Sequence, residues 1–127
     1  MKNIRHMGLV VSDMEKALYF YRDLLGLKIQ GTTNEEGNFI NQLLNKEDIK
    51  LKTVKLSTDD NTTRIELFNT GFTHVAFTVD NLDEIYMHLK NGGVQFNCPP
   101  KLSPNGMLKV TFCRDFEGNY LELTQEI

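Results

Sequence analysis

The sequence lacks two features that would place it in large functional classes. It contains no run of about 18 apolar residues, so no membrane partner is expected, and the apolar stretch within the N-terminal MKNIRHMGLVV is too short for a signal peptide. It also contains no basic run, and 14 Lys+Arg residues stand against 17 Asp+Glu residues, giving a net charge of -3. Because nucleic-acid binding needs clustered cations, nucleic acid is not an expected partner. We expect a soluble, cytoplasmic protein.

Cysteine is also scarce. Cys98 and Cys113 follow neither a CxxC pattern nor the spacing of a zinc ribbon, and in a reducing compartment we expect both to remain free thiols. The 127 residues, 40% of them hydrophobic, can supply a proper core without a disulfide. We therefore expect a single domain over residues 1–127.

The two halves of the chain resemble each other. The segment RHMGLVVSDMEKALYFYRDLLGLKI aligns with THVAFTVDNLDEIYMHLKNGGVQF, and DDNTTRIELF aligns with DFEGNYLELT. These alignments place His6 on His74 and Glu66 on Glu122. We expect one repeat at residues 1–70 and a second at residues 71–127.

Each repeat is predicted to form a strand, a helix and three further strands. Alternation predicts the first strand of each repeat, with Leu9 on one face and His6 on the other. Capping boxes beginning at Ser12 and Asn81 predict the starts of the two helices. The remaining strands are expected at 27–31, 50–57, 64–68, 94–96, 107–114 and 120–125, with a further helical segment at 37–45.

The four repeated polar residues share one face of these strands. Apolar residues alternate with Glu66 and Glu122, so both glutamates lie opposite the helix-covered face, as do His6 and His74. Taken singly, a strand histidine is more often structural and a strand glutamate more often solvent-facing. The internal repeat instead favours joint binding of one divalent ion, and two imidazoles with two carboxylates suit Zn, Ni, Co, Mn or Fe(II).

Other polar residues carry weaker indications. His88 lies beside Lys90 on a predicted helix surface, where we expect it to be solvated. Exposure is also the first expectation for a group of strand residues that could reach a pocket: Arg5, Arg64, Asn97, Lys109, Arg114 and Tyr120. Among these, Arg64 and Tyr120 share the face of the glutamates and are the best candidates to line a pocket.

The repeated segments resemble the vicinal oxygen chelate superfamily, which includes glyoxalase I, methylmalonyl-CoA epimerase, extradiol dioxygenases, and fosfomycin and bleomycin resistance proteins. The resemblance covers essentially the whole chain. It implies an α+β fold in which tandem βαβββ modules form a U-shaped, half-closed mixed β-barrel covered by helices. It also implies that His6, Glu66, His74 and Glu122 occupy the family's four metal-ligand positions, and that the protein is a homodimer.

The ligand set narrows the activity that the resemblance implies. An intact His-Glu-His-Glu set is closest to the glyoxalase and epimerase branch, whereas ring-cleaving dioxygenases use two histidines and one carboxylate. We expect a metal-dependent lyase or isomerase that acts on a small oxygenated carbonyl compound through a metal-stabilised enolate. Glu122 is the first candidate for the catalytic base, and Glu66 is its mate.

Two other functions remain open: a non-catalytic small-molecule binding or resistance protein, and an extradiol-type dioxygenase. The segment Phe68-Asn69-Thr70-Gly71-Phe72 lacks the longer aromatic stretch of glutathione-using glyoxalase I. This difference argues against glutathione-linked substrates.

Overall fold

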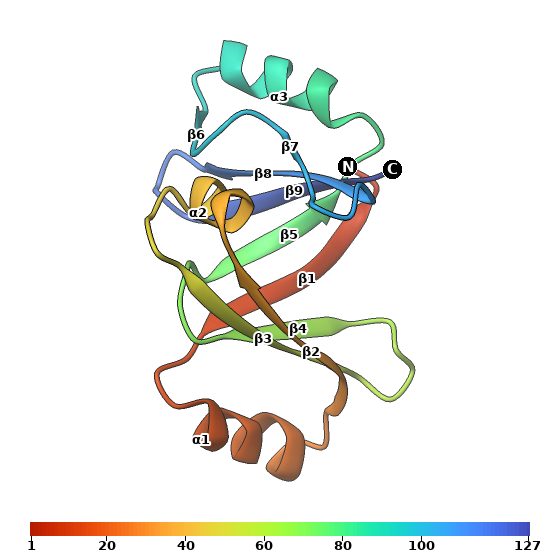
Figure 1. Cartoon of the computed structure of the whole chain (residues 1–127). Coiled ribbons are helices and arrows are strands. Elements are labelled where there is room, and N and C mark those ends of the chain that lie inside the picture. The colour runs from red at the N-terminus through yellow and green to blue at the C-terminus, as the bar shows by residue number, and fades with distance from the viewer.

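The computed structural model describes residues 1–127 and contains one large sheet with three helical regions (Figure 1). The strands are β1 (Asn3–Val10), β2 (Lys28–Glu36), β3 (Lys50–Ser57), β4 (Arg64–Phe68), β5 (His74–Thr78), β6 (Gln95–Phe96), β7 (Lys101–Leu102), β8 (Leu108–Arg114) and β9 (Tyr120–Glu126). The helices are α1 (Met14–Leu18), which continues as the π-helical η1 (Tyr19–Leu24), α2 (Asn38–Leu44) and α3 (Leu82–Asn91). None of these helices has the length and apolar character that a membrane crossing requires.

The strands form one mixed sheet in the order β2-β3-β4-β1-β5-β9-β8-β6, with β7 paired to β8. In each half the first and last strands run parallel, β1 beside β4 and β5 beside β9. The antiparallel pair β1 and β5 joins the halves. The sheet curves without closing (Figure 1), so the α+β fold with an open, curved sheet confirms the fold expected from the sequence. The division into repeats at residue 70 stays a prediction.

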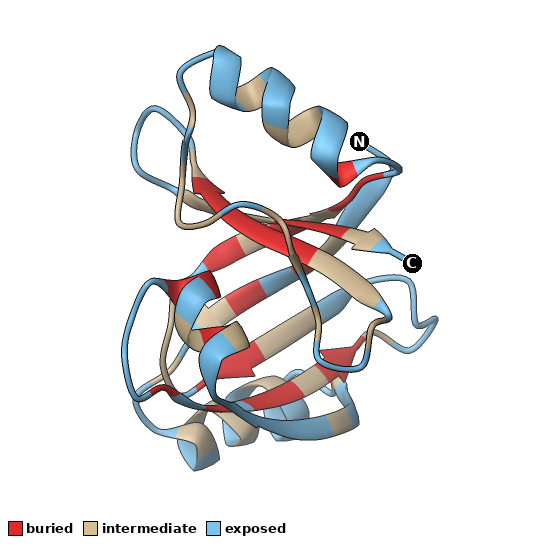
Figure 2. Cartoon of the chain, turned by 45° about the horizontal axis from the view of Figure 1, so that its top comes forward, coloured by how far each residue is buried: buried red, intermediate tan, exposed pale blue.

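Helices α1 and α3 lie at opposite ends of the molecule, each outside its own half of the sheet (Figure 1). Beneath α1, the fully buried Leu56 and Leu67 contact Leu18, while Leu82 of α3 packs against Leu123 of β9. Burying one such leucine contributes about 1.5–3 kcal/mol. The buried residues accordingly concentrate on the strands, and the helix surfaces that face outward are exposed (Figure 2).

Helix α2 connects the two halves. It begins after Gly37, whose φ of 106 favours glycine, and ends at the left-handed Asn45, which confirms the helix expected at 37–45. Its buried Ile40, Leu43 and Leu44 form one cluster with two residues of β8, Val110 and Phe112. The same cluster contains Leu51 of β3 and Phe68 of β4, so α2 joins apolar residues of both halves.

Most strand ends lie within one residue of those predicted and β7 was not predicted, but two boundaries differ for clear physical reasons. Strand β2 continues to Glu36 instead of ending at 31, because residues 32–36 pair with β3 although their side chains are polar. Helix α1 is capped by Asp13 and not by Ser12, because α1 begins one residue later and the Asp13 carboxylate accepts a hydrogen bond from the Lys16 N–H at 3.1 Å. Asn81 caps α3 as predicted.

The outer face of β1 is covered less than expected. Leu9 and Val11 pack beneath α1, but Met7 stays 46% exposed and Ile4 is 64% exposed. A register shift between Ile4 and His6 leaves Arg5 as an extra residue on this strand. Arg5 consequently reaches the concave side of the sheet, where it lines the cavity described below.

Candidate metal centre

The four residues singled out by the repeat lie on the four central strands: His6 on β1, Glu66 on β4, His74 on β5 and Glu122 on β9. The register is the same in both halves. Glu66 lies opposite Gly8 of β1, and Glu122 lies opposite Ala76 of β5. Across the seam, Gly8 pairs with His74 and Ala76 pairs with His6, so all four side chains reach the concave floor of the sheet.

Three of the four side chains meet at one point. Nε2 of His6 and Nε2 of His74 are 3.3 Å apart. One carboxylate oxygen of Glu122 lies 3.4 Å from the first of these nitrogens and 3.1 Å from the second. Both histidines are buried. One ligand atom from each of these three residues lies within 4.8 Å of the others, a spacing that a single metal ion could bridge.

Glu66 lies beside this group, not within it. Its Oε2 is 3.1 Å from Nδ1 of His6, the ring nitrogen that faces away from His74 and Glu122. The predicted four residues are therefore neighbours, but the structure gathers His6, His74 and Glu122 most closely. Glu66 orients His6, as carboxylates commonly do for metal-binding histidines. A role for all four as ligands stays a prediction.

The hydrogen bonds around the histidines determine which nitrogens are free. Nδ1 of His74 donates to the Phe72 carbonyl oxygen at 2.7 Å, and Nδ1 of His6 can donate to Glu66. When both imidazoles are neutral, their Nε2 lone pairs then face each other and the Glu122 oxygen, with no hydrogen between them. Three converging lone pairs repel unless a proton or a metal cation lies among them, and two imidazoles with one carboxylate are a donor set that fits one divalent metal ion.

The carboxylate and imidazole at the centre shift each other's protonation. Burial would raise the pKa of Glu122, but hydrogen bonds from His6 and His74, which form without a metal when Nε2 of these rings carries a proton, outweigh burial and lower that pKa below its ordinary value. Burial would lower the pKa of His74, but the hydrogen bond and charge of Glu122 raise it. The hydroxyl of Thr124 donates to the other Glu122 oxygen at 2.9 Å and holds this carboxylate in place.

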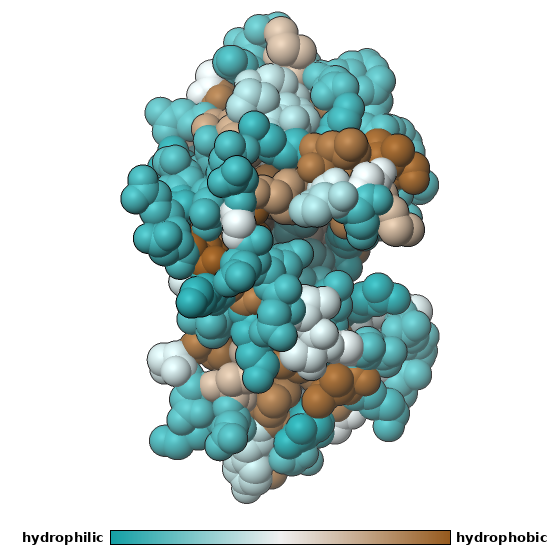
Figure 3. Space-filling model, in the orientation of Figure 1, coloured by the Kyte–Doolittle hydropathy of each residue, from teal (hydrophilic) through white to brown (hydrophobic).

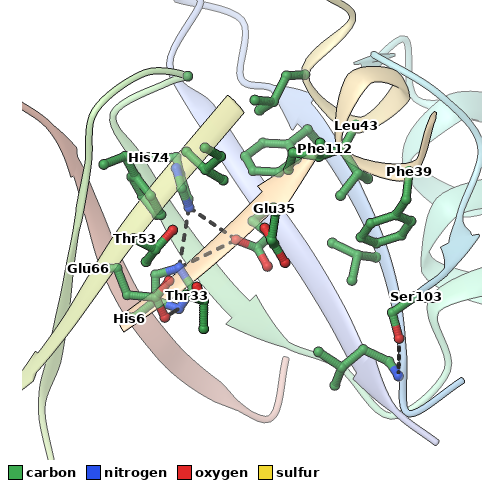
Figure 4. Close-up of a pocket in the computed structure, with 18 of the residues that line it drawn as sticks. His6, Thr33, Glu35, Phe39, Leu43, Thr53, Glu66, His74, Ser103 and Phe112 are labelled. Atoms are coloured by element: carbon green, nitrogen blue, oxygen red, sulfur yellow. Dashed lines mark hydrogen bonds and ion pairs between the residues drawn. The ribbon is translucent and has the colours of Figure 1, made fainter. Parts of the chain in front are cut away.

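A cavity of about 480 Å³ opens above the cluster (Figure 4). One wall is apolar and comes from α2, β8 and the segment that precedes β5: Phe39, Ile40, Leu43, Leu44, Phe72, Leu108, Val110 and Phe112. The opposite wall is polar and comes mainly from β1 to β4: Arg5, Thr33, Glu35, Thr53, Lys55 and Arg64. The site therefore combines an ionic floor, an apolar wall and a polar wall, as small-molecule sites do.

Gly8 provides the space that His74 needs on the cavity floor. A Cβ at this position would lie 2.5 Å from Cε1 of His74 and 2.5 Å from Cε2 of Phe68. His74 stacks on the Phe68 ring, with centroids 5.5 Å apart. Any larger residue at position 8 would push the imidazole away from Glu122.

The remaining predictions on polar residues divide into two groups. Arg5 and Arg64 line the cavity, whereas Tyr120 stacks on Phe72 outside it. Asn97 donates to the Leu43 carbonyl oxygen, and Lys109 pairs with Asp83. The exposure expected for His88 and the free state expected for both cysteines are confirmed.

Glu35 is the site residue that sequence reasoning missed. It lies on the extension of β2 beyond residue 31 and lines the same cavity as Glu66 and Glu122 (Figure 4). Burial raises its pKa, the charge of Lys55 opposes this, and the charges of Glu122 and Glu66 add to the increase. Nothing in the polar run Thr32-Thr33-Asn34-Glu35-Glu36 marks it as a strand; only the unpaired edge of β3 could have indicated a longer partner.

An open half-barrel with a His/Glu cluster on its floor defines a class of small-molecule-binding fold. Within that class, the chain belongs to the Glyoxalase/Bleomycin resistance protein/Dioxygenase superfamily, whose sequence model matches residues 3–123.

Individual relatives agree with this assignment. The chain is 28% identical to a lactoylglutathione lyase of Schizosaccharomyces pombe over 97% of its length, but it covers only 47% of that protein. It is 29% identical to the protein YwkD of Bacillus subtilis, covering 99% of this chain and 98% of the relative. Among solved structures, the methylmalonyl-CoA epimerase of Mycobacterium tuberculosis shares the fold with a TM-score of 0.71 and 19% identity, over 98% of this chain and 87% of that one.

Proposed function

We propose that the protein is a metal-dependent lyase or isomerase that acts on a small oxygenated carbonyl compound. The observation that carries this proposal is the convergence of His6 Nε2, His74 Nε2 and a Glu122 oxygen at the floor of a cavity. The cavity is large enough for a small metabolite and has both polar and apolar walls. Relatives named lactoylglutathione lyase and methylmalonyl-CoA epimerase support this reaction class.

Each group of site residues has a distinct role in this proposal. His6, His74, Glu122 and the adjacent Glu66 hold one divalent ion, which could be Zn, Ni, Co, Mn or Fe. When bound, that ion supplies Lewis-acid stabilisation of negative charge that develops on a substrate oxygen. Glu122 accepts the proton that leaves the neighbouring carbon, and Glu66 is its symmetry-related mate. The apolar wall of α2 and β8 excludes water from the reacting atoms.

Elemental analysis of protein purified without a histidine tag tests the metal site. We expect about one divalent ion per chain in the wild type and almost none in His6→Ala or Glu122→Gln. The matched control is Lys52→Gln, which changes an exposed residue of β3 that does not line the cavity. If the wild type is purified without metal and does not bind added Ni, Co, Zn or Mn, the enzyme proposal is contradicted and a binding or resistance protein is favoured.

Turnover tests the reaction class once the metal is loaded. The assay covers hemithioacetals of 2-oxoaldehydes with several thiols, and acyl-thioester epimers followed by solvent deuterium exchange. We expect metal-dependent conversion of one of these groups and its loss in Glu122→Gln. Full metal occupancy without conversion of either group would contradict the lyase or isomerase proposal.

A second candidate function is an extradiol-type dioxygenase. It is favoured by one observation: the tight group of two histidines and one carboxylate, with Glu66 beside it, matches the ligand set of non-haem Fe(II) oxygenases. Oxygen consumption with a catechol and Fe(II), under air, separates the two functions. Catechol-dependent oxygen uptake that occurs only with Fe(II) bound would favour the dioxygenase and contradict the isomerase proposal.

We also propose that the protein forms a homodimer. Apolar residues form only small, separated patches on the face seen in Figure 3. The outer face of β1, however, exposes Ile4 and Met7 beside the antiparallel seam with β5. Sedimentation equilibrium should give the mass of two chains for the wild type and of one chain for Met7→Lys. A monomeric wild type would contradict the dimer.

A further inference from the structure

Two cations on the polar wall of the cavity lie close to the candidate metal centre. Lys55 of β3 lies directly opposite Glu66 of β4 in the strand register. Arg64 precedes Glu66 by two residues on the same strand, so its side chain emerges on the same face. Both residues line the cavity, and Lys55 is partly buried there.

Neither cation forms a side-chain hydrogen bond or a close ion pair within the chain. The ion pairs made by lysine or arginine involve other residues: Lys2, Arg5, Arg22, Lys28 and Lys109. Glu66, the carboxylate nearest to both in register, instead bonds His6. Arg5, the third cation of the cavity, is bonded to Glu126 at 3.2 Å and to Thr78. Lys55 and Arg64 therefore face the cavity with their donors free.

The charges of the cavity leave room for an anion. Besides the paired Arg5, the lining contains Lys55 and Arg64 against three carboxylates, Glu35, Glu66 and Glu122. A divalent ion on the histidine–glutamate cluster would leave one excess positive charge. An acid group of a ligand would offset this charge, and the two cations that make no close ion pair lie on the polar wall, not among the apolar residues of α2.

We propose that Arg64 and Lys55 bind a carboxylate of the substrate, so that the protein acts on a carbonyl compound that carries a free acid group. This proposal rests on the proposed function and specifies the substrate class of the same site. Arg64 offers a planar pair of N–H donors that matches a carboxylate, and Lys55 adds a point charge. The hydrocarbon part of such a compound would contact the wall formed by Phe39 and Leu43 of α2 and Phe112 of β8.

The spacing of residues along β4 limits the position of the acid group. Two residues along a strand correspond to about 7 Å, so the Arg64 backbone lies about that far from Glu66. The acid group is consequently a second group, separate from the oxygens at the metal centre by a short carbon chain. A compound with one chelating head and one distal carboxylate fits both ends of the cavity.

Two probes isolate the distal carboxylate. 2-Oxoglutarate and 2-oxopentanoate have the same chain length and the same 2-oxo acid head, and only the former carries a second carboxylate. Their affinities for wild-type protein are measured by calorimetry, both with the metal loaded and in chelator. We expect 2-oxoglutarate to bind at least about tenfold more tightly, since a charge-assisted hydrogen-bonded pair contributes this much or more. High salt should reduce this preference.

Three variants locate the preference. In Arg64→Gln and Lys55→Gln we expect the ratio of the two affinities to fall toward one, while the affinity for 2-oxopentanoate stays the same. Lys52→Gln, on the opposite face of β3, should keep the wild-type ratio. Neither Arg64 nor Lys55 touches the histidines, so the metal content of all three variants should match that of the wild type.

The outcomes separate this proposal from the proposed function. Equal binding of the two probes to the wild type, no binding of either at millimolar concentration, or an unchanged ratio in both cavity variants would overturn the carboxylate site. If the wild type binds no metal or shows no turnover but still prefers 2-oxoglutarate, the lyase or isomerase proposal is overturned and the carboxylate site is retained.

Discussion

The two walls of the cavity come from opposite halves of the molecule, and they differ in burial and chemistry. Strand β2, at the edge of the sheet in the first half, is exposed along almost its whole length, whereas β8, which lies between β9 and β6 in the second half, is buried over most of its residues. Two features account for the difference: β2 has a neighbour on one side only while β8 is paired on both sides, and α2, which follows β2 in the chain, also packs on β8. The edge strand of the first half thus forms a polar, solvated wall, and α2 together with β8 forms an apolar one.

The two glutamates also differ in the contacts that they make. Glu122 contacts both histidines and Thr124, while Glu66 contacts His6 alone, at the ring nitrogen directed away from the cluster. Equivalence in sequence therefore did not make the two carboxylates equivalent in the site. The following predictions test how far the two halves differ.

The largest effect is expected at the glutamates. Because binding free energies of about 10–16 kcal/mol are shared among a few ligands, removing a ligand should lower metal affinity by several hundredfold. We expect a loss of this order for Glu122→Gln and only about 10–100-fold for Glu66→Gln, the usual cost of losing a carboxylate that orients a histidine. Competition titration with a metal-binding dye measures both. Equal losses would show that Glu66 is a full ligand.

The next effect concerns the contact of α2 with the second half. Leu44→Ala removes a buried side chain from the cluster with Val110 and Phe112, and should cost about 2–5 kcal/mol of unfolding free energy. Leu102→Ala, at a side chain 56% exposed, should change stability by less than about 0.5 kcal/mol. Urea unfolding compares them. A similar small loss in both would mean that α2 does not support the second half.

A smaller effect is expected at Gly8. Gly8→Ala forces His74 and Phe68 to move and should cost about 1–3 kcal/mol, together with weaker metal binding. Gly31→Ala is the matched control, since a Cβ there meets nothing within 4 Å. Ala76, the equivalent of Gly8 in the second half, already carries a Cβ next to His6 in register. A Gly8→Ala protein with normal metal affinity would contradict the close packing of His74.

The smallest effect is the pH dependence of metal binding. The proton on His74 competes with the metal, and because Glu122 raises the pKa of His74 above 6.5, this competition begins at a higher pH than for an ordinary histidine. We expect affinity to fall by up to about tenfold per pH unit below that raised pKa. Titrations from pH 8 to 5.5 measure it. A constant affinity down to pH 6 would contradict the raised pKa.

Sequence reasoning succeeded where a local pattern and the internal repeat agreed. The alternation around Glu66 and Glu122 placed both on the cavity face, and the repeat placed the histidines beside them. It missed Glu35 because β2 is an edge strand with polar residues on both faces, which local alternation does not distinguish from a loop. It could not place α2 on β8, because that packing depends on the curvature of the whole sheet. The N-cap of α1 was assigned to Ser12 instead of Asp13, because the predicted start of the helix was one residue too early.

The seam between β1 and β5 has a consequence for the order in which the molecule is assembled. His6 lies on the first strand of this fold and Glu122 on the last, and the candidate metal cluster needs both. A chain still emerging from the ribosome, with β9 not yet formed, lacks the oxygen that lies between the two imidazoles. Any ion that these three residues hold can therefore be acquired only after β9 has folded, and its retention would report that β1 and β9 have folded together.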